Sequence, residues 1–398
     1  MVEWVKLRIG QRLLWAEFNG LKLSEMHIAW LGKKTPFCGN VTYGREITGA
    51  LVNRGHKVSF MHFDDTKADG DEVPLPFLYK SQVYTIPTIR AKKVLERSLR
   101  RLKPDLVHAS LSLSTLDFLL PEICQELNLP LISTFHPPYD GKRRNITATT
   151  QLLAYQLYAP FLAKYDRTII FCEEQQDLLV KLGVPRNRIT IIPNGVDDLK
   201  YTPGPNNIRG EFNARQIYVY QGRISTEKNV EALLKAWKYC NMSEYGCKLL
   251  LVGDGPLKAN LEVAYNTEHG VVWLGAIRDD DRRIEILRGA DVFILPSLVE
   301  GLSLSLLEAM ACGVACIATD AGADASVICD DAGVLIGTQG VAGQLRTLLP
   351  IIREHPQWRE ALGKSARQRV LDRYTLSGNI DQIEALYGEI LAPLRAVS

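Results

Sequence analysis

Five short motifs between residues 216 and 322 combine basic, acidic and glycine residues, and each follows an apolar run. In chain order they are Gln221-Gly222-Arg223 with Lys228, Val252-Gly253-Asp254-Gly255-Pro256, Trp273-Leu274-Gly275, Glu300-Gly301 with Glu308, and Ala318-Thr319-Asp320-Ala321-Gly322. Their side chains supply cations and carboxylates, and their glycines let backbone amides approach a ligand. These groups can bind a diphosphate together with the hydroxyls of a sugar.

Arg223 and Lys228 are two cations five residues apart, on a loop that leads into a predicted helix. Such a pair can bind a diphosphate through charge-assisted hydrogen bonds. If the diphosphate is a leaving group, its negative charge grows as the bond breaks, and the cations stabilise the transition state more than the ground state. A solvated loop can carry the same two residues, so the pair alone does not establish a site.

The segment Gly253-Asp254-Gly255-Pro256 resembles a dinucleotide-binding fingerprint, but the third glycine is missing. Pro256 suits the first position of the following helix. The segment therefore predicts a tight turn that brings the backbone close to a ligand. A purely structural turn from strand to helix explains it equally well.

Glu300 and Glu308 are the most informative acidic residues of the sequence. Glu300 is predicted in the loop after the strand Val292–Leu295, and Glu308 in a short helix that ends before Gly313. A carboxylate can accept hydrogen bonds from two neighbouring hydroxyls of a ribose or a hexose. Backbone amides at a helix start suit phosphate oxygens, and here they belong to Leu302, Ser303 and Leu304.

Short apolar runs alternate with longer amphipathic segments such as Val230–Trp237 and Leu257–Ala264. This alternation predicts parallel sheets covered by helices on both faces, divided between two doubly wound, Rossmann-like α/β domains. The predicted strands are His27–Leu31, Val58–Phe63, Asp105–Ala109, Leu131–Phe135, Arg167–Phe171, Ile189–Ile192, Ile217–Tyr220, Leu249–Val252, Val271–Leu274, Val292–Leu295, Ala315–Ala318 and Val334–Ile336.

The domain boundary is predicted between residues 193 and 205, where proline, asparagine and glycine are densest. We expect an N-terminal domain over residues 26–196 and a C-terminal nucleotide-sugar-binding domain over residues 197–377. Residues 1–25 form a leader that precedes the first strand. Its charged residues argue against a secretory signal, so it is either an upstream start or an interfacial helix.

The composition is that of a soluble globular protein of 398 residues, with 46% hydrophobic and 23% charged residues. A net charge of +2 argues against general nucleic-acid binding. The eight cysteines show no metal-site spacing, which favours thiols in a reducing cytoplasm and no metal ion. No apolar run is long enough for a transmembrane helix.

The string from Glu300 through Glu308 to Gly313 resembles the E-x7-E signature of retaining GT-B glycosyltransferases of family 4, which use nucleotide sugars. The Arg223 and Lys228 motif and the Gly253 turn fall in that family's order. The first half also resembles the family in four motifs: Phe37-Cys38-Gly39-Asn40, Arg54-Gly55-His56-Lys57-Val58, Pro104-Asp105-Leu106-Val107-His108 and Thr134-Phe135-His136. The resemblance covers about residues 26 to 390.

The resemblance implies a role for each matching residue. Arg223 and Lys228 would bind the diphosphate, Glu308 the ribose hydroxyls, and Glu300 would face the transferred sugar. His136 would contact the sugar or the acceptor. The remaining donor-binding positions would be Gly39, Asn40, Gly222, Gly253, Gly255, Leu302, Ser303 and Leu304.

The family retains the anomeric configuration without a protein nucleophile, cofactor or metal ion. The resemblance also implies that residues 378–398 form a helix that packs back on the first domain. Several positions depart from the usual pattern. Asn40 replaces a second glycine, and Ala323 follows Gly322 where a second glycine is common. Leu302-Ser303 replaces a frequent Phe-Gly, which leaves the donor sugar open.

A basic amphipathic helix between Arg90 and Lys103 bears on the acceptor, because such helices can lie on anionic lipid. Its apolar stripe is Ala91, Val94, Leu95, Leu99 and Leu102, and the candidate membrane contacts are Arg90, Lys92, Lys93, Arg97, Arg100 and Arg101. Lys142-Arg143-Arg144 could extend the basic patch. A helix packed on a sheet shows the same pattern.

The segment Gly32 to Asn40 and the Thr134-Phe135-His136 motif resemble those of family members that make glycolipids, including the cyanobacterial digalactosyldiacylglycerol synthases. The resemblance implies a peripheral enzyme on the cytoplasmic face of a membrane, which moves a hexose from UDP-galactose or UDP-glucose to a glycolipid such as monogalactosyldiacylglycerol. A soluble transferase acting on a polysaccharide or small molecule, a glycoside hydrolase, a nicotinamide oxidoreductase and a non-catalytic nucleotide-sugar sensor are the alternatives.

Overall fold

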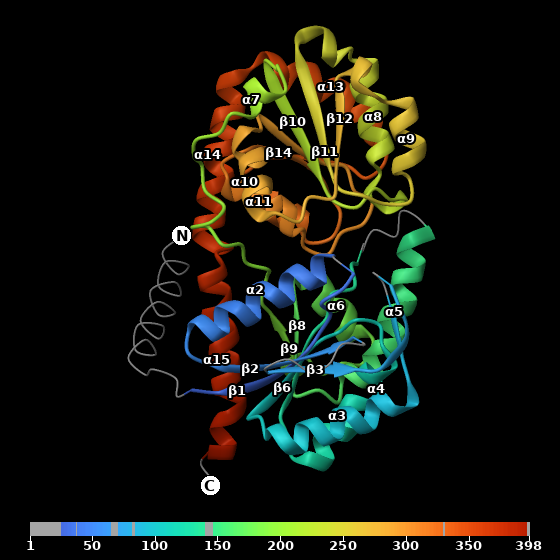
Figure 1. Cartoon of the computed structure of the whole chain (residues 1–398), viewed down its shortest axis with the longest axis vertical. Helices are drawn as coiled ribbons and strands as arrows, with labels where there is room; N and C mark the ends of the chain where they lie inside the picture. The colour runs from blue at the N-terminus through green and yellow to red at the C-terminus, as the bar shows by residue number, and fades with distance from the viewer. Residues whose placement is uncertain are drawn as a thin grey trace.

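The computed structural model describes residues 25–36, 38–64, 71–81, 84–139, 146–328 and 331–395. The described chain forms two α/β domains that are stacked along the long axis of the molecule (Figure 1). Each domain holds a parallel sheet with helices on both faces, so the predicted pair of Rossmann-like domains is confirmed.

The N-terminal domain is built on a seven-stranded sheet in the order β3-β2-β1-β6-β7-β8-β9. Its neighbouring strands are all parallel, and β1, β6 and β7 are almost entirely buried, as their apolar sequences require. The strands are β1 His27–Leu31, β2 Lys57–Phe63, β3 Glu72–Leu75, β6 Leu106–Ser110, β7 Leu131–Thr134, β8 Arg167–Ile170 and β9 Ile189–Ile191. The helices are α2 Gly39–Asn53, α3 Ile89–Leu102, α4 Thr115–Leu127, α5 Ile146–Leu162 and α6 Glu173–Lys181.

The C-terminal domain is built on a six-stranded parallel sheet in the order β12-β11-β10-β13-β14-β15. The strands are β10 Gln216–Gln221, β11 Cys247–Val252, β12 Val271–Gly275, β13 Val292–Leu295, β14 Ala315–Thr319 and β15 Val334–Ile336. The helices are α7 Ile208–Glu211, α8 Val230–Tyr239, α9 Lys258–Ala264, α10 Asp280–Gly289, α11 Leu304–Ala311, α12 Asp324–Ile328, α13 Val341–Glu354 and α14 Pro356–Arg373. The order of the strands reverses beside β10, which puts the ends of β10 and β13 at a switch point suited to ligands.

All twelve predicted strands occur in the structure, with their ends moved by at most two residues. The sequence analysis missed β3, which is a short edge strand containing Pro74. It also missed the antiparallel hairpin formed by β4 Phe77–Lys80 and β5 Thr85–Pro87. These strands are short and half exposed, so they lack the continuous apolar run that marks a central strand.

The last helix, α15 Leu376–Arg395, returns from the C-terminal domain and packs against the N-terminal domain (Figure 1). Arg54 beside α2 binds Asp381 at 2.6 Å and Glu384 at 2.7 Å. The buried face of α15 joins a core that also contains Met26, Ile28 and Trp30; it consists of Ile380, Ile383, Leu386, Tyr387 and Leu391. The chain therefore crosses between the domains twice, and Val196 pairs with Thr375 where the two crossings meet.

No helix among the described residues is long and apolar enough to cross a membrane. The predicted leader lies outside the described residues except for Glu25, and so does the Lys142-Arg143-Arg144 segment.

Candidate active site between the domains

A cleft of about 580 Å³ lies between the two domains, beyond the carboxyl ends of the central strands of both sheets. From the N-terminal domain it is lined by Gly39, Asn40, Tyr43 and His136, among others. From the C-terminal domain its lining includes Gly222, Arg223, Lys228, Gly253, Arg283, Glu300, Leu302, Ser303, Leu304 and Glu308. The structure thus brings together residues that are separated by more than 250 positions in the sequence.

Lys228 and Glu300 form an ion pair in this cleft. Lys228 ends a short 3-10 helix after β10, and Glu300 lies in the loop after β13. Lys228 Nζ donates to Glu300 Oε1 at 2.5 Å, and the Ser297 hydroxyl donates to the same oxygen at 2.7 Å. Because Glu300 is buried, this cation compensates a carboxylate that water barely reaches. The sequence analysis placed both residues in the site but did not predict that they pair.

Arg223 lines the cleft beside Lys228 and forms an ion pair with Glu227, four residues further along the chain. The Ser225 hydroxyl donates to the same carboxylate at 2.7 Å. The backbone N–H of Leu298 donates to the Glu227 carbonyl at 2.8 Å, which ties this loop to the Glu300 loop. Both predicted diphosphate-binding cations therefore occupy one wall of the cleft, each balanced by a carboxylate.

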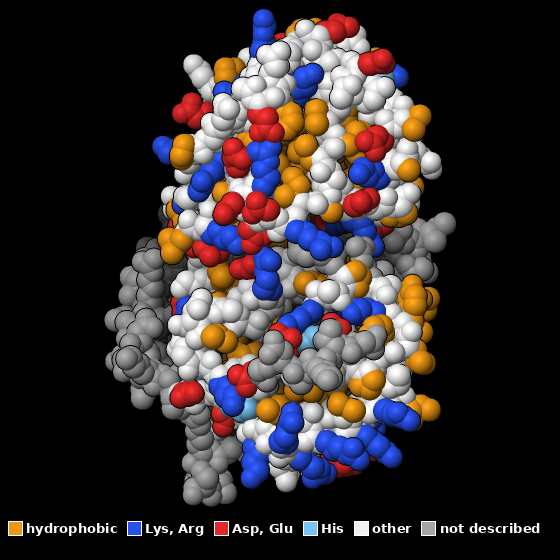
Figure 2. Space-filling view, in the orientation of Figure 1, with side chains coloured by type: hydrophobic (Ala, Val, Ile, Leu, Met, Phe, Trp, Pro, Cys, Tyr) orange, Lys and Arg blue, Asp and Glu red, His pale blue; other side chains and the backbone are white. Residues whose placement is uncertain are grey.

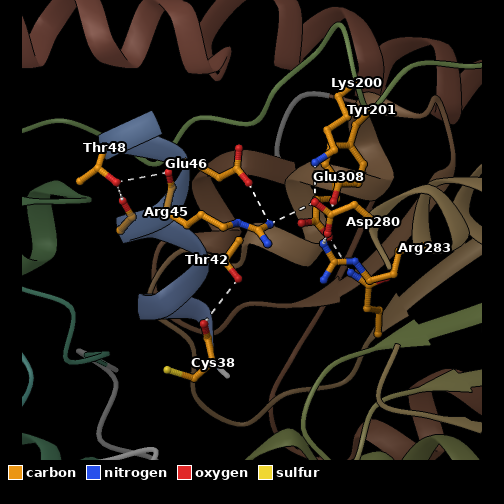
Figure 3. A network of polar contacts seen from close by, with 12 residues as sticks. Cys38, Thr42, Arg45, Glu46, Thr48, Lys200, Tyr201, Asp280, Arg283 and Glu308 are labelled. Atoms are coloured by element: carbon orange, nitrogen blue, oxygen red, sulfur yellow. Dashed lines mark hydrogen bonds and ion pairs between the residues drawn. The ribbon is translucent and has the colours of Figure 1, made fainter. Parts of the chain in front are cut away.

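Glu308 is buried on α11 and accepts a hydrogen bond from Gln221 Nε2 at 2.5 Å. Burial raises its pKa, while the nearby charge of Arg283 and a hydrogen bond from Tyr201 oppose that rise. Arg283 reaches the cleft from α10, where it also contacts Asp280 (Figure 3). The sequence analysis named Gln221 in its first motif but gave it no role. It missed Arg283, which carries no local signal that tells it from a surface residue.

Two helix N-termini open onto the cleft and carry positive partial charge there. Helix α2 begins at Gly39 with no acidic residue in its first turn, and α11 begins at Leu304. The Ser303 amide departs from the prediction, because it donates to the buried Asp324 carboxylate at 2.8 Å instead of pointing freely at a ligand. Asp324 was not foreseen, and burial raises its pKa well above the usual value.

A glycine is required at position 253 by a close contact between the ends of β10 and β11. A Cβ on Gly253 would lie 1.8 Å from the Gly222 carbonyl oxygen, and the φ of Gly253 is +149°. Only glycine fits this approach. Gly255 is not among the residues that line the cleft; a Cβ there would lie 2.3 Å from the Ile224 carbonyl oxygen, so this glycine serves packing.

A chain of hydrogen bonds determines which ring nitrogen of His136 carries the proton. Asn40 Nδ2 donates to the Leu111 carbonyl at 3.1 Å, so its Oδ1 faces Ser110, whose hydroxyl donates to it at 2.8 Å. The Ser110 oxygen then accepts from His136 Nε2 at 2.9 Å, which places the imidazole proton on Nε2. Burial, with the charge of Lys33, lowers the pKa of His136 to about 3. His136 therefore lines the cleft as a neutral ring with a lone pair on Nδ1.

Direct polar contacts join the two domains beside the cleft. Arg45 on α2 binds Asp280 on α10 at 3.1 Å, and Lys200, which belongs to the same domain as Asp280, binds that carboxylate at 2.5 Å (Figure 3). Asn194 Nδ2 donates to the Leu302 carbonyl at 2.9 Å. These contacts orient α2 toward the C-terminal domain, so the two helix N-termini converge on one space.

Helix α3 does not offer its apolar stripe to a membrane. Ala91, Leu95 and Leu99 are buried, and Val94 and Leu102 pack against the same core of the N-terminal domain. Of the two interpretations of this pattern, the structure shows the helix packed on a sheet, with the apolar stripe covering that sheet. The basic side chains remain on the surface: Arg90, Lys93, Arg97, Arg100 and Arg101 are exposed, and Lys92 is half-buried beside Glu96. They gather at the end of the N-terminal domain in Figure 2.

Within the described residues, no group of three or more His, Cys, Asp or Glu side chains is placed to hold a metal ion.

Comparison with known proteins identifies the family. Residues 39–198 match the family model described as Glycosyltransferase Family 4, and residues 206–369 match Glycosyl transferases group 1. The two matches follow each other and span both domains. The chain belongs to the GT-B glycosyltransferases.

Two curated relatives illustrate the match. The chain is 28% identical over 249 residues to the UDP-Gal:alpha-D-GlcNAc-diphosphoundecaprenol alpha-1,3-galactosyltransferase of Escherichia coli, across 59% of this chain and 63% of that protein. It is 26% identical over 282 residues to the sulfoquinovosyl transferase SQD2 of Arabidopsis thaliana, across 68% of this chain and 54% of that protein. The matches thus span little more than half the length of these relatives.

Solved structures of low sequence identity share the fold. Sucrose-phosphate synthase from Thermosynechococcus elongatus superposes with a TM-score of 0.74 at 22% identity, over 93% of this chain and 100% of that one. Anabaena Alr3699/HepE in complex with UDP-glucose superposes with a TM-score of 0.74 at 19% identity, over 92% and 100%.

Proposed function

We propose that this protein transfers a hexose from a nucleotide sugar to an acceptor hydroxyl, with retention of the anomeric configuration. One observation carries the proposal: Arg223, Lys228 and the N-termini of α2 and α11 surround a single cleft that also contains Glu300 and Glu308. Cations and helix amides suit a diphosphate, and the two carboxylates suit sugar hydroxyls.

The proposed reaction breaks the bond between the anomeric carbon and the diphosphate and forms a bond from that carbon to the acceptor oxygen. The acceptor attacks from the side on which the diphosphate leaves, and the departing phosphate takes the acceptor proton. Arg223 and Lys228 stabilise the charge that develops on the diphosphate. Glu308 holds the ribose and Glu300 faces the hexose, while His136 accepts a hydrogen bond from a sugar hydroxyl at Nδ1. No metal ion or cofactor takes part in this proposal.

The proposed donor is UDP-galactose or UDP-glucose. Two names support it: the Escherichia coli relative is named for UDP-Gal, and the Anabaena structure of the same fold is a complex with UDP-glucose. Leu302 and Ser303 contribute to the cleft, so they are candidates for determining which hexose binds.

The proposed acceptor is a membrane glycolipid such as monogalactosyldiacylglycerol, reached from the cytoplasmic face by a peripheral enzyme. Relatives named for diphosphoundecaprenol and for phosphatidyl-myo-inositol support a lipid acceptor. The exposed basic face of α3 supports contact with an anionic surface, since each basic residue near such a surface contributes about 1 kcal/mol.

The decisive experiment incubates the purified protein with a panel of sugar nucleotides and a total lipid extract, and identifies products by mass and by NMR of the new linkage. The proposal expects a glycolipid with the donor's anomeric configuration. An inverted linkage would refute the mechanism, and release of free sugar without nucleotide would indicate a hydrolase.

A transferase with a soluble acceptor is the second candidate, because a glycogen synthase and an N-acetyl-alpha-D-glucosaminyl L-malate synthase also match the chain. Transfer to water-soluble acceptors alone would favour it. Flotation with liposomes provides a second readout. The lipid proposal expects flotation that is lost when Arg97, Arg100 and Arg101 are all changed to Glu.

A further inference from the structure

Large apolar side chains are exposed together at the β4–β5 hairpin and the first residue of α3. The side chain of Leu78 is 74% exposed and that of Ile89 is 96% exposed. Tyr79 pairs with Ile86 across the hairpin, and these two residues are about half exposed. The Tyr79 and Tyr84 rings lie 5.5 Å apart. Single exposed apolar residues are common on protein surfaces, but a contiguous group marks a binding surface.

The hairpin is tied to the cleft through the loop that follows β1. Lys80 Nζ donates to Thr35 Oγ1 at 2.6 Å, and Lys33 Nζ donates to the Ser81 carbonyl at 3.4 Å. Pro36, the next residue of that loop, lines the cleft. The hairpin therefore lies on the N-terminal domain beside a loop that lines the cleft.

The same group continues directly into the basic face of α3. Ile89, Lys93, Arg97 and Arg100 follow one another at intervals of three or four residues, so they lie along one face of the helix, and all four are exposed. A surface with apolar side chains at one end and cations along the rest matches an anionic bilayer, whose headgroups attract the cations and whose acyl boundary accepts the apolar side chains.

We infer that the β4–β5 hairpin and Ile89 form the apolar part of a membrane-docking surface, with α3 as its basic part. We define this docking surface as Leu78, Tyr79, Tyr84, Ile86 and Ile89 together with Lys93, Arg97 and Arg100. Its partner is an anionic lipid bilayer. Leu78 and Ile89 insert between headgroups, and the Lys33 and Lys80 contacts hold the cleft entrance against the surface. The inference rests on the proposed function, because it supplies the route by which a lipid acceptor reaches the cleft.

The test compares two double variants of the full-length protein. Leu78→Ser with Ile89→Ser removes the most exposed apolar side chains of the docking surface. The matched control is Leu199→Ser with Val263→Ser, which removes two side chains that are 85% and 83% exposed elsewhere on the molecule. Cosedimentation is measured with vesicles of phosphatidylcholine alone and of phosphatidylcholine mixed with phosphatidylglycerol. Affinity for the nucleotide sugar is measured by calorimetry, and Ile89→Ser alone serves as the mildest variant.

The inference expects the wild type and the control to bind mixed vesicles, and the hairpin variant to bind them about tenfold or more weakly, which corresponds to about 1.4 kcal/mol. Donor affinity stays unchanged in every variant. Equal vesicle binding by the hairpin variant and the wild type, or concentration-dependent dimerisation that the hairpin variant abolishes, would overturn the inference. Vesicle binding without sugar transfer would instead refute the proposed function, while the inference of a membrane-docking surface would still hold.

Discussion

The pairing of Lys228 with Glu300 leads to a prediction that separates catalysis from folding. Lys228→Ala removes one oriented cation beside the proposed leaving diphosphate. Loss of one such stabiliser of developing charge lowers turnover by about 10² to 10³, or about 2.7–4 kcal/mol. Because the cation acts on charge that grows in the transition state, we expect kcat to fall much more than the affinity for the nucleotide sugar.

The same substitution leaves the Glu300 carboxylate without its cation, although the Ser297 hydroxyl still donates to it. Breaking a fully buried pair costs about 3–5 kcal/mol. The Lys228 side chain remains 21% exposed, so water partly replaces it and we expect a loss of about 1–3 kcal/mol in the free energy of unfolding. Adding Glu300→Gln removes the uncompensated charge. The double variant should regain stability and still turn over slowly.

Single-turnover kinetics, calorimetric titration with the donor and urea unfolding measure the three quantities on the same preparations. Lys235→Ala is the matched control, because Lys235 forms a surface ion pair with Glu231 at 2.7 Å on α8 and should change rate and stability little. A Lys228→Ala rate within a few-fold of the wild type would refute the role of this cation. Equal losses in donor affinity and in kcat/KM, with kcat unchanged, would show that Lys228 stabilises the ground state as much as the transition state.

Further predictions concern the other groups of the site. Glu308→Ala should weaken donor binding by about 1.5–3 kcal/mol in calorimetry, and unchanged affinity would remove it from the ribose contact. Ser110→Ala should move the His136 proton from Nε2, visible in nitrogen-15 NMR, with a lower kcat/KM; an unchanged tautomer would contradict the hydrogen-bond chain. Burial lowers the pKa of His108 to about 3, as it does for His136. The free energy of unfolding should therefore be highest above about pH 6.5 and should fall toward pH 3 by about 1.4 kcal/mol per pH unit for each histidine. A urea-unfolding free energy that stays constant between neutral and acidic pH would contradict this. Chelation of divalent metals should leave single-turnover rates intact, and a strict metal requirement would contradict the proposed mechanism.

The sequence was sufficient for features that depend on local pattern. A central parallel strand appears in the sequence as a short apolar run, and a polar residue or a glycine follows it at the carboxyl end of the strand. The strands and the residues at their ends could therefore be predicted from the sequence. Glu300 in a loop and Glu308 in the helix after it follow from such a pattern, and the structure has them there. Edge strands such as β3 escape this approach, since they alternate and are only partly buried.

Contacts between distant residues were beyond the sequence. Lys228 meets Glu300 across 72 positions, and His136 depends on Ser110 at the end of β6 and on Asn40 at the start of α2. The apolar stripe of α3 shows the same limit, because its pattern is identical whether the partner is a sheet or a lipid surface. By itself, the sequence determined the two-domain fold and the motifs at its strand ends, because these follow from periodicity within single elements. Only the tertiary structure decided which charges neutralise each other and which faces meet solvent, because both depend on the packing of elements far apart in the chain.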